Sequence, residues 1–454
     1  MRVTLIYPFK KRCIQGCNPP ISILYLAASL QKAGYNVAVI DRDEDNISDL
    51  DILKRLNDYQ PTLIGIPLFS NHMRTAYDLV NLLSSHNADW KIVIGGPHAT
   101  ARPEQVLEIF KGCNYVLRGE SEDSIVDLAR CIENNSSLDA VRGLSYKQNG
   151  SIFHNPDAVV NMDLDSIQFP NRKLIDTAYK KKTYFRIGHR GTTDVIITSR
   201  GCPFNCNFCF KITKIFRARS PENVLEELML IRSQGIRNVH IMDDLFVVPK
   251  SRCLTILKMI KEQKLDMEFK VRSRVDLINE ELLVAMKEAG VKAVVYGFES
   301  GSQKILDLMN KQTTVEMNYK VIALTKKVGL QCYADIFIGY PGETIETINE
   351  TQKFILKAKP TAVNFAVMYP LPNTKVYDLA KEQGTLINDW SVNGPQPWIK
   401  LPWIENKDIL FTYRRKMLRK YLTSPVVIAN VIRFTLFKID FRQLKMIIRY
   451  FFRL

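Results

Sequence analysis

The chain has few histidines and no apolar run long enough for a membrane-spanning helix. Only six histidines occur in 454 residues. The charge-free apolar stretches of the C-terminal tail fall far short of the roughly 20 residues that a bilayer requires. Internal repeats and low-complexity tracts are also absent. The first residues, MRVTLI, begin a predicted strand and carry no signal-peptide cleavage site, so we expect a cytoplasmic protein.

Three of the nine cysteines stand close together. Residues 198–209 read TSRGCPFNCNFC and contain Cys202, Cys206 and Cys209, directly after an apolar run typical of a buried strand. Three thiolates at this spacing can bind three irons of a cuboidal cluster and leave the fourth iron without a protein ligand. The motif therefore predicts a metal site with one open position for a substrate or cofactor.

A structural zinc site and a disulfide framework are the alternatives. Tetrahedral zinc needs four ligands that usually come in short paired spacings, and neither His189 nor His240 provides such a pair. The remaining cysteines are scattered through a long chain, which disfavours a disulfide framework. An iron–sulfur site is the better interpretation.

Apolar strands and amphipathic helices alternate through the second half of the chain, and we assign residues 194–390 to one domain. Six β/α units with right-handed crossovers predict an open, partial (β/α)6 barrel whose ligands bind at the carboxyl ends of the strands. Strands are expected at 195–198, 239–242, 268–271, 293–297, 334–339 and 363–368, with helices including 221–233, 251–261, 280–289 and 315–327.

Polar residues and glycines follow these strands. They are Asp243 and Asp244 after the second strand, Arg272 and Arg274 after the third, Glu299 and Ser300 after the fourth, and Gly339 and Gly342 after the fifth. A strand-end ion pair with Asp276 would explain the arginines equally well, and tight turns also need glycine. Their recurrence at one edge of the sheet favours a ligand site.

Residues 1–133 predict a different domain. Strands at 3–7, 37–40, 63–66, 92–94 and 115–117 alternate with helices at 21–33, 75–85, 103–110 and 122–132, which is the pattern of a doubly wound parallel sheet. Small residues in the loops beyond the strands would let a flat ligand approach the backbone. No GxGxxG follows the first strand, so a dinucleotide ligand is disfavoured.

The CxxxCxxC motif, with Phe208 before its last cysteine, resembles that of the radical S-adenosylmethionine (SAM) superfamily. The resemblance implies a [4Fe-4S] cluster on Cys202, Cys206 and Cys209, whose open iron binds SAM. It further implies a 5′-deoxyadenosyl radical that abstracts hydrogen, and an electron donor such as flavodoxin or ferredoxin. By the same resemblance, Asp243 or Glu299 would hold the ammonium or ribose of SAM, Arg272 or Arg274 its carboxylate, and the segment of Gly339 and Gly342 its adenine.

Segments 19–28 (PPISILYLAA), 34–41 (GYNVAVID), 95–100 (GGPHAT) and 118–120 (RGE) resemble the cobalamin-binding, Rossmann-type domain that precedes the radical domain in one branch of this superfamily. The DxHxxG motif of proteins that ligate cobalt through histidine is absent, and a lone histidine in a Gly-Gly-Pro turn is more often a packing residue. The resemblance therefore implies base-off cobalamin. The implied contacts are Ser70, Gly95, Gly96, Pro97, His98, Ala99, Thr100, Gly119 and Glu120.

Residues 134–193 are expected to link the two domains, with a hairpin at Asn149 and Gly150 and no chemistry of their own. Residues 391–454 are expected to form a basic, apolar helical region. From 401 to 454, twelve Lys and Arg against three Asp and Glu contribute a net +9 of the formal +16. An interfacial helix at the cytoplasmic membrane face, a helical cap on the barrel, and contact with RNA phosphates all fit this composition.

Together the resemblances imply a cobalamin-dependent radical SAM enzyme. We expect a C-methyltransferase acting on an unactivated carbon of a small hydrophobic, lipid- or porphyrin-like substrate. A cyclase or other rearranging enzyme without net methylation is the first alternative. A tRNA-modifying enzyme or a metal-stabilised RNA-binding protein is disfavoured, because radical SAM enzymes that modify tRNA usually append a small β-barrel and this tail predicts helices. Phe246, Tyr296 and Tyr369 fit either a substrate site or the core.

Overall fold

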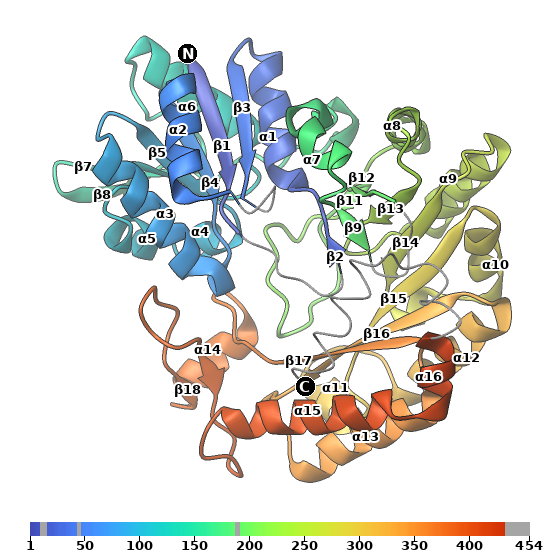
Figure 1. Ribbon diagram of the computed structural model, residues 1–454. Helices are drawn as coiled ribbons and strands as arrows, with labels where there is room; N and C mark the ends of the chain where they lie inside the picture. The colour runs from blue at the N-terminus through green and yellow to red at the C-terminus, as the bar shows by residue number, and fades with distance from the viewer. Residues whose placement is uncertain (10–15, 43–46, 187–190, 432–454) are drawn as a thin grey trace.

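A seven-stranded sheet forms the centre of the first domain in the computed structural model, which describes residues 1–9, 16–42, 47–186 and 191–431 (Figure 1). A hairpin of β7 (Leu144–Gln148) and β8 (Ser151–His154) lies antiparallel at one edge, with Asn149 and Gly150 of its turn at φ +50° and +82°. The sheet therefore extends beyond residue 133 and takes up the predicted hairpin. Its parallel strands, in spatial order, are β3 (Asn36–Asp41), β1 (Arg2–Tyr7), β4 (Leu63–Pro67), β5 (Lys91–Gly95) and β6 (Tyr115–Leu117).

Helices cover both faces of this sheet and bury a separate apolar core on each side. Because both faces are buried, the parallel strands are nearly continuous apolar runs. The strand order reverses at β1, so the carboxyl ends of β1 and β4 form the switch point where doubly wound sheets bind ligands. One face carries α1 (Ile21–Lys32) and α6 (Glu122–Asn134); the other carries α2 (Asp49–Tyr59), α3 (Met73–His86), α4 (Pro97–Ala101) and α5 (Pro103–Ile109).

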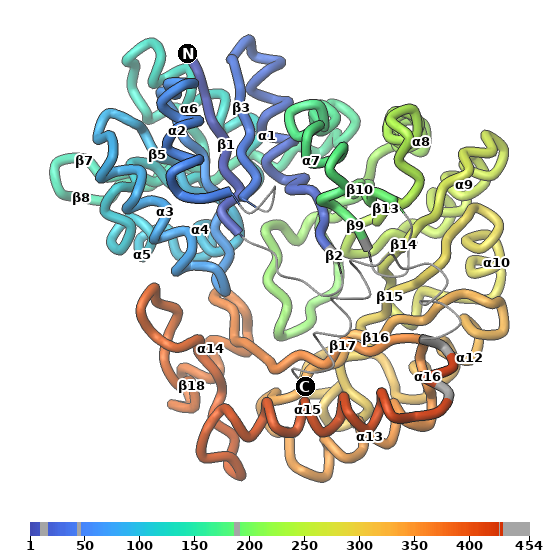
Figure 2. The backbone as a smooth tube through the Cα atoms, in the orientation of Figure 1, coloured from blue at the N-terminus to red at the C-terminus, as the bar shows by residue number. Residues whose placement is uncertain are grey.

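The second domain is an open barrel of six parallel strands in sequence order (Figure 2). All six predicted strands are present. They are β10 (Thr193–Ile196), β13 (Asn238–Ile241), β14 (Glu268–Ser273), β15 (Val291–Glu299), β16 (Gln331–Ile338) and β17 (Ala362–Val367). The connecting helices are α8 (Pro221–Ser233), α9 (Lys250–Glu262), α10 (Glu280–Glu288), α11 (Gln303–Leu308), α12 (Val315–Val328) and α13 (Ile345–Ala358).

Three short strand pairs and one short helix complete the junction and the C-terminal region. The pair most important for the site is β11 (Ser199–Arg200) with β12 (Arg217–Ala218), because the three cysteines lie on the loop between them. The others are β2 (Gly16–Cys17) with β9 (Phe185–Arg186), β18 (Leu386–Ile387) with β19 (Trp398–Ile399), and the helix α7 (Asp176–Lys180).

The C-terminal region packs on both domains. α14 (Lys375–Glu382) and the segment after it place Tyr377 and Trp390 in an apolar core of the first domain, and Gln105 donates to Trp390 O over 2.7 Å. α15 (Asp408–Leu422) lies along the barrel (Figure 1), with Leu410, Met417 and Tyr421 buried. The structure thus places a docked cap at α15, followed by α16 (Pro425–Val431).

The remaining part of the predicted basic tail, residues 432–454, lies outside the described residues. Among the residues that are described, no helix is both long and apolar enough to cross a membrane.

Candidate functional site

The cysteine loop, residues 201–216, is held by its own backbone and by neighbouring turns. Gly201 has φ +80°, and a Cβ there would clash with the carbonyl oxygen of Ile215, so this position requires glycine. Lys211 donates to the carbonyl oxygens of Cys202, over 3.0 Å, and Phe204. Asn207 N donates to Met309 O over 3.0 Å. The loop is therefore fixed at both its base and its tip.

The three thiols of this loop, Cys202, Cys206 and Cys209, lie near one another. Cys209 is exposed at its surface, yet desolvation by the surrounding protein atoms raises its pKa, and the neighbouring Asp244, Cys206 and Cys202 add to the rise. The first domain and barrel, as far as they are described, contain no group of three His, Cys, Asp or Glu side chains arranged around a single ion. Thiolates that share a cuboidal cluster each bind a different iron, so they need not converge on one point.

Asp243 and Asp244 are adjacent in sequence but do different work. Asp243 is buried and accepts hydrogen bonds from Thr198 N (2.6 Å), Thr198 Oγ1 and Ser199 Oγ (2.8 Å). Its carboxylate is therefore used to hold the strand end that leads into the cysteine loop. Asp244 instead lines the large cavity described below. The sequence analysis named Asp243 or Glu299 as a SAM contact, and the structure shows that the Asp243 carboxylate already accepts three hydrogen bonds within the protein.

The two strand-end arginines both have protein partners, which fits the ion-pair interpretation left open above. Arg272 Nη2 lies 2.8 Å from Asp335 Oδ2 on the inner face of the barrel. Arg274 is buried, pairs with Asp276 and donates to Lys311 O over 2.8 Å. Its guanidinium also lies 3.7 Å from the centre of the Phe204 ring, and Nη1 lies 3.8 Å from Cys206 Sγ. Arg274 thus contacts the cysteine loop directly.

Two buried carboxyl groups lie at or just after the carboxyl ends of the adjacent strands β15 and β16. Glu299 has φ +62° and receives Lys311 Nζ on one oxygen at 2.7 Å; Glu343 accepts a hydrogen bond from Gly339 N. Within the described chain, Oε2 of Glu299 and Oε1 of Glu343 have no hydrogen-bond partner. Burial raises the pKa of Glu343 to about 7. Buried acceptors without partners are costly, so these two oxygens are suited to meet a ligand.

Gly339 and Gly342 are close-packing positions. Their φ values are +91° and +85°, and a Cβ would lie 2.8 Å from Leu410 at the first and 2.6 Å from Leu308 at the second. Protein side chains therefore approach both glycines. The adenine contact predicted for this segment stays a prediction.

A cavity of about 460 Å³ lies between the two domains, at the switch point of the first sheet. Its deep wall is apolar and includes Leu5, Val93 and Leu117. Of the predicted cobalamin contacts, Gly95, Gly96, Pro97, Gly119 and Glu120 line it. The barrel side contributes residues that the sequence did not single out for this role, among them Arg200, Lys211 and Asp244, with Tyr25 and Glu122 from the first domain. For Arg200 and Lys211, the nearness to the cysteine motif in the sequence was a usable signal.

The other predicted cobalamin contacts, Ser70, His98, Ala99 and Thr100, are not in the cavity lining. His98 is buried with Nδ1 2.8 Å from Ser70 Oγ and Nε2 3.1 Å from Gln105 Oε1, so both ring nitrogens have partners. Burial lowers the pKa of His98 to about 4. Thr100 accepts a hydrogen bond from Gly119 N over 3.0 Å, and Ala99 is fully buried. These residues support the cavity loops from behind.

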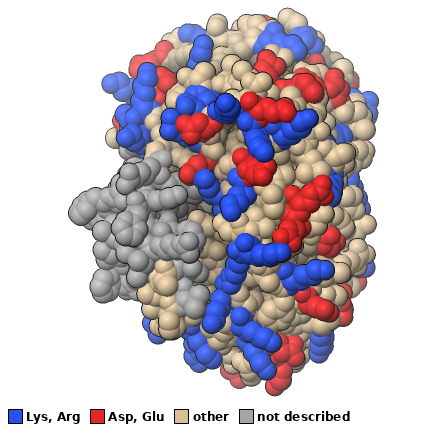
Figure 3. Space-filling view, turned by 90° about the vertical axis from the view of Figure 1, so that its right-hand side faces the viewer, with Lys and Arg blue, Asp and Glu red and all other residues tan. Residues whose placement is uncertain are grey.

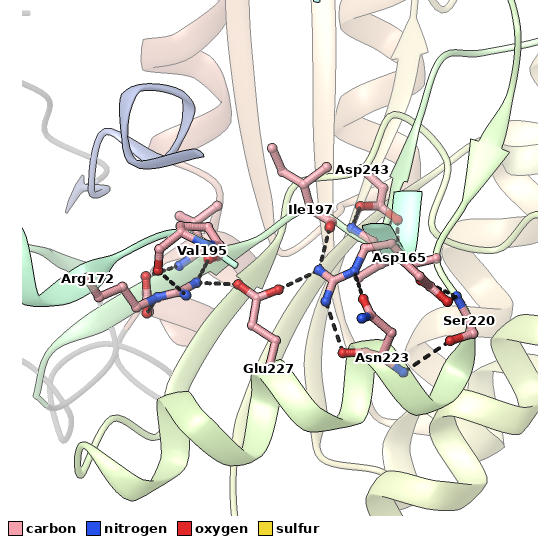
Figure 4. Close-up of polar contacts among 12 residues, drawn as sticks. Asp165, Arg172, Val195, Ile197, Ser220, Asn223, Glu227 and Asp243 are labelled. Atoms are coloured by element: carbon pink, nitrogen blue, oxygen red, sulfur yellow. Dashed lines mark hydrogen bonds and ion pairs between the residues drawn. The ribbon is translucent and has the colours of Figure 1, made fainter. Parts of the chain in front are cut away.

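A buried charge network ties residues 134–193 to the strand that precedes the cysteines (Figure 4). Arg172 pairs with Asp194 at 2.5 Å and with Glu227 at 2.8 Å, and Arg219 pairs with the other oxygen of Glu227. Arg219 Nη1 also donates to Ile197 O over 3.0 Å. The sequence analysis assigned no chemistry to residues 134–193, yet their Arg172 anchors the entry to the cysteine loop.

Phe246 and Tyr296 belong to the core rather than to a substrate surface. Both are fully buried, and the Tyr296 hydroxyl bonds to Thr325 of α12 on the outer side of the sheet. Tyr369 is partly buried, with Lys407 Nζ 4.5 Å from its ring centre.

Comparison with known sequences finds matches to both halves of the chain. Residues 11–129 match the family described as the B12 binding domain, and residues 196–355 match the radical SAM superfamily. An uncharacterised methyltransferase of Pyrococcus horikoshii is 30% identical over 95% of this chain and 95% of its own length. The anaerobic magnesium-protoporphyrin IX monomethyl ester cyclase of Rubrivivax gelatinosus is 26% identical over 94% of this chain and 79% of its own length.

Two solved structures share the fold. The radical SAM methyltransferase TsrM of Kitasatospora setae, with cobalamin and a [4Fe-4S] cluster bound, superposes with a TM-score of 0.72 at 18% identity, covering 87% of this chain and 78% of that chain. The radical enzyme OxsB, with aqua-cobalamin and S-adenosylmethionine bound, superposes with a TM-score of 0.78 at 20% identity, covering 99% of this chain and 70% of that chain. At these identities the likeness concerns the fold, and it extends over both domains.

Proposed function

Because the chain belongs to the radical SAM enzymes that carry an N-terminal B12-binding domain, we propose that it is a cobalamin-dependent C-methyltransferase. The observation that carries the proposal is the cavity of about 460 Å³ at the switch point of the first sheet, which faces the cysteine loop of the second domain. One wall includes Gly95, Gly96 and Gly119, and the other includes Gly201, Phe210 and Lys211 of the cysteine loop. In this proposal the two cofactor sites are neighbours.

The residues present fit an iron–sulfur cluster and SAM. Cys202, Cys206 and Cys209 would hold three irons, and the pairing of Lys211 with the loop carbonyls keeps the loop in place. The unpartnered oxygens of Glu299 and Glu343 and the carboxylate of Asp244 would receive the polar groups of SAM. When bound, the cluster and SAM supply one-electron chemistry that removes a hydrogen atom from an unactivated carbon.

The residues also fit cobalamin. Gly65, Gly95, Gly96 and Gly119 on the cavity wall leave backbone accessible, and the apolar deep wall suits a nucleotide tail. Both ring nitrogens of His98 are used inside the domain, so no ligand from this residue reaches the cavity. Cobalamin would bind base-off, without ligation by His98, and would supply the methyl group.

The substrate site in this proposal is the inner face of the barrel. Along β14 and β16, buried side chains alternate with partly exposed ones, and the partly exposed side chains form this inner face. They are largely polar: Arg272 pairs with Asp335, and Lys270 Nζ lies 5.0 Å from the centre of the Tyr333 ring. Near the cysteines the face becomes apolar, with the rings of Phe208 and Phe337 5.6 Å apart. A hydrophobic body carrying polar groups, as in a porphyrin, fits this face better than a pure hydrocarbon lipid.

A cyclase without net methylation is the second candidate. It is favoured by the similarity to the Rubrivivax gelatinosus cyclase over nearly the whole chain. Product mass separates the two, since methylation adds one CH₂ and cyclisation does not.

RNA binding has less support. The outer helices of the barrel carry charges of both signs (Figure 3), and several pair between neighbouring helices, including Lys250 with Glu281 and Lys261 with Glu288. A positive stripe for phosphate contacts is not seen on this face.

A cytoplasmic location and a peripheral membrane contact belong to the same proposal. Outside the cysteine loop, Cys113, Cys131, Cys253 and Cys332 form no disulfide, which suits a reducing compartment. The apolar face of α15 is buried on the barrel, so a membrane contact would use its outward basic side chains Arg415, Lys416 and Lys420. The test is co-sedimentation with anionic vesicles, in wild type and in a variant with Arg415, Lys416 and Lys420 all changed to Gln. Equal co-sedimentation of the two proteins would contradict this contact.

Anaerobic reconstitution with hydroxocobalamin tests the function. We expect about four irons and about one cobalt per chain, with 5′-deoxyadenosine and S-adenosylhomocysteine formed from SAM after reduction by flavodoxin or ferredoxin. Iron and 5′-deoxyadenosine without cobalt would exclude cobalamin-dependent methyl transfer.

A further inference from the structure

We infer that Glu120, Arg200 and Arg217 form an interdomain clamp that fixes the cysteine loop over the cavity, with Arg217 acting as a positioning residue. The inference rests on the proposed function for its catalytic consequence and on contacts alone for its structural part. Glu120 belongs to the loop after β6 of the first domain, and both arginines belong to the second domain.

Both arginines bind the same carboxylate. Arg217 Nη2 lies 2.5 Å from Glu120 Oε1 and Nη1 lies 2.9 Å from Oε2, which is a bidentate pair. Arg200 Nη1 lies 3.2 Å from the same Oε2, and its Nη2 lies 2.6 Å from Glu122 Oε1. Two carboxylates thus balance two guanidinium groups.

The positions of the arginines explain what the clamp holds. Arg200 is the last residue of β11, Arg217 is the first residue of β12, and the two are register partners in the antiparallel pair. The loop with Cys202, Cys206 and Cys209 leaves through one and returns through the other. Glu120 therefore grips both stems of the cysteine loop at once.

The clamp is well shielded from solvent, so its energy is not lost to screening. The Arg217 side chain is 2% exposed and that of Glu120 is 13% exposed. Burial disfavours the charged form of Glu120, yet the hydrogen bond of Arg217 and the charges of both arginines outweigh it and hold the pKa of Glu120 below its ordinary value. Arg217 Nη1 also donates to Asn161 O over 2.7 Å, and the Arg200 guanidinium lies 5.3 Å from the ring centre of Tyr25 on α1.

The clamp stands between the two cofactor sites. Glu120, Glu122 and Arg200 line the cavity, whereas Arg217 does not. The ion pairs of this clamp join residues of the first domain, before 134, to residues of the second domain, after 193. The hydrogen bond from Gln105 to Trp390 O joins the first domain to the C-terminal region, and the Arg172 network holds residues 134–193 to the barrel. Loss of Arg217 should therefore change the placement of the cysteine loop relative to the cavity rather than unfold either domain.

Hydrogen exchange on the full apo chain tests the structural part. In Arg217→Gln we expect amide exchange in residues 118–122 and in residues 199–217 to quicken together, by about tenfold in each segment, with other segments unchanged. Arg217→Lys keeps the charge but loses the bidentate geometry and should be intermediate. Arg237→Gln, at a pair where both side chains are more than half exposed, is the matched control and should behave as wild type. Unchanged exchange at residues 118–122 in Arg217→Gln would overturn the clamp.

The catalytic part uses protein reconstituted with iron, sulfide and hydroxocobalamin, with dithionite as reductant. We expect the ratio of S-adenosylhomocysteine to 5′-deoxyadenosine to fall about tenfold in Arg217→Gln, because methyl transfer needs both cofactor sites in place and SAM cleavage needs the barrel alone. An unchanged ratio would overturn the positioning role. If wild type binds no cobalamin, the proposed function fails, and the exchange result still decides the clamp. If Arg217→Gln does not fold, Glu122→Gln removes the ion pair between Glu122 and Arg200 instead. The same two measurements are then made on that variant, with the same expected results.

Discussion

Arg217 and Glu120 meet across the domain boundary, with Arg217 Nη2 2.5 Å from Glu120 Oε1, although 97 positions separate them in the chain. This one pair links the loop after the last parallel strand of the first domain to the base of the cysteine loop. It shows how the cavity and the metal-binding motif are kept in a fixed relation, and that relation underlies the function proposed above.

The cysteine loop should hold the cluster through all three thiols. In Cys206→Ala we expect iron retention and reductive SAM cleavage to be lost, because two thiolates leave two of the four irons without protein ligands. The circular dichroism of the chain should be unchanged, since the first domain has its own cores. Cys131→Ala, at a partly exposed cysteine outside the loop, is the control. SAM cleavage retained in Cys206→Ala would contradict the cluster assignment.

Substitutions of Asp243 and Asp244 should have different effects, the first on the stability of the protein and the second on SAM binding. Asp243→Asn should lower the free energy of unfolding by about 2 kcal/mol, because the buried carboxylate accepts three hydrogen bonds from Thr198 and Ser199. Asp244→Asn should leave stability within about 0.5 kcal/mol and weaken SAM binding. Urea titration and equilibrium SAM binding measure the two effects. If Asp243→Asn weakened SAM binding and Asp244→Asn lowered the stability instead, Asp243 would be the ligand contact.

The two buried ion pairs that Glu227 forms with Arg172 and Arg219 should make the protein sensitive to neutralisation of Glu227. Glu227→Gln should cost about 3–5 kcal/mol, because it leaves two buried guanidinium groups short of a counter-charge. Glu226→Gln, at the exposed position next to it on α8, should change stability by less than about 0.5 kcal/mol. Thermal or urea unfolding measures both. Equal stability of the two variants would show that the network is dispensable.

His98 should make stability depend on pH in the acid range. Its pKa is lowered from 6.5 to about 4, so folding favours the neutral ring; the stabilisation is complete above pH 6.5 and is lost as the pH falls toward 4. The loss should amount to about 3 kcal/mol over this window. His98→Gln should remove that slope, while His86→Gln, at an exposed histidine, should keep it. Identical pH profiles for His98→Gln and wild type would contradict the buried neutral ring.

Several features of the fold could be read directly from the sequence. The six barrel strands and the five parallel strands of the first sheet follow from largely apolar runs of three to six residues between turn residues, and all are present. The two family resemblances are confirmed by the matches to residues 11–129 and 196–355. Helix α2 was missed because it is mostly polar, although Ser48 and Asp51 form a capping box that marks its start.

The C-terminal tail shows where composition stops being informative. An apolar and basic helix suits a membrane surface and a docked cap equally well. The structure buries Leu410, Met417 and Tyr421 of α15 on the barrel, and Tyr421 donates to Pro360 O over 2.8 Å. Docking is decided by the shape of the surface that the barrel offers, which the tail sequence does not contain.

The sequence by itself determined the cysteine loop and the strands of the two sheets, because these depend on local periodicity and on spacing within a few residues. Tertiary structure alone decided that Asp243 turns inward while Asp244 faces the cavity, that both nitrogens of His98 are used up, and that Glu120 pairs with Arg217. Each of these depends on which distant side chain is near enough to share a proton or a charge, and only the packing of the two domains fixes that distance.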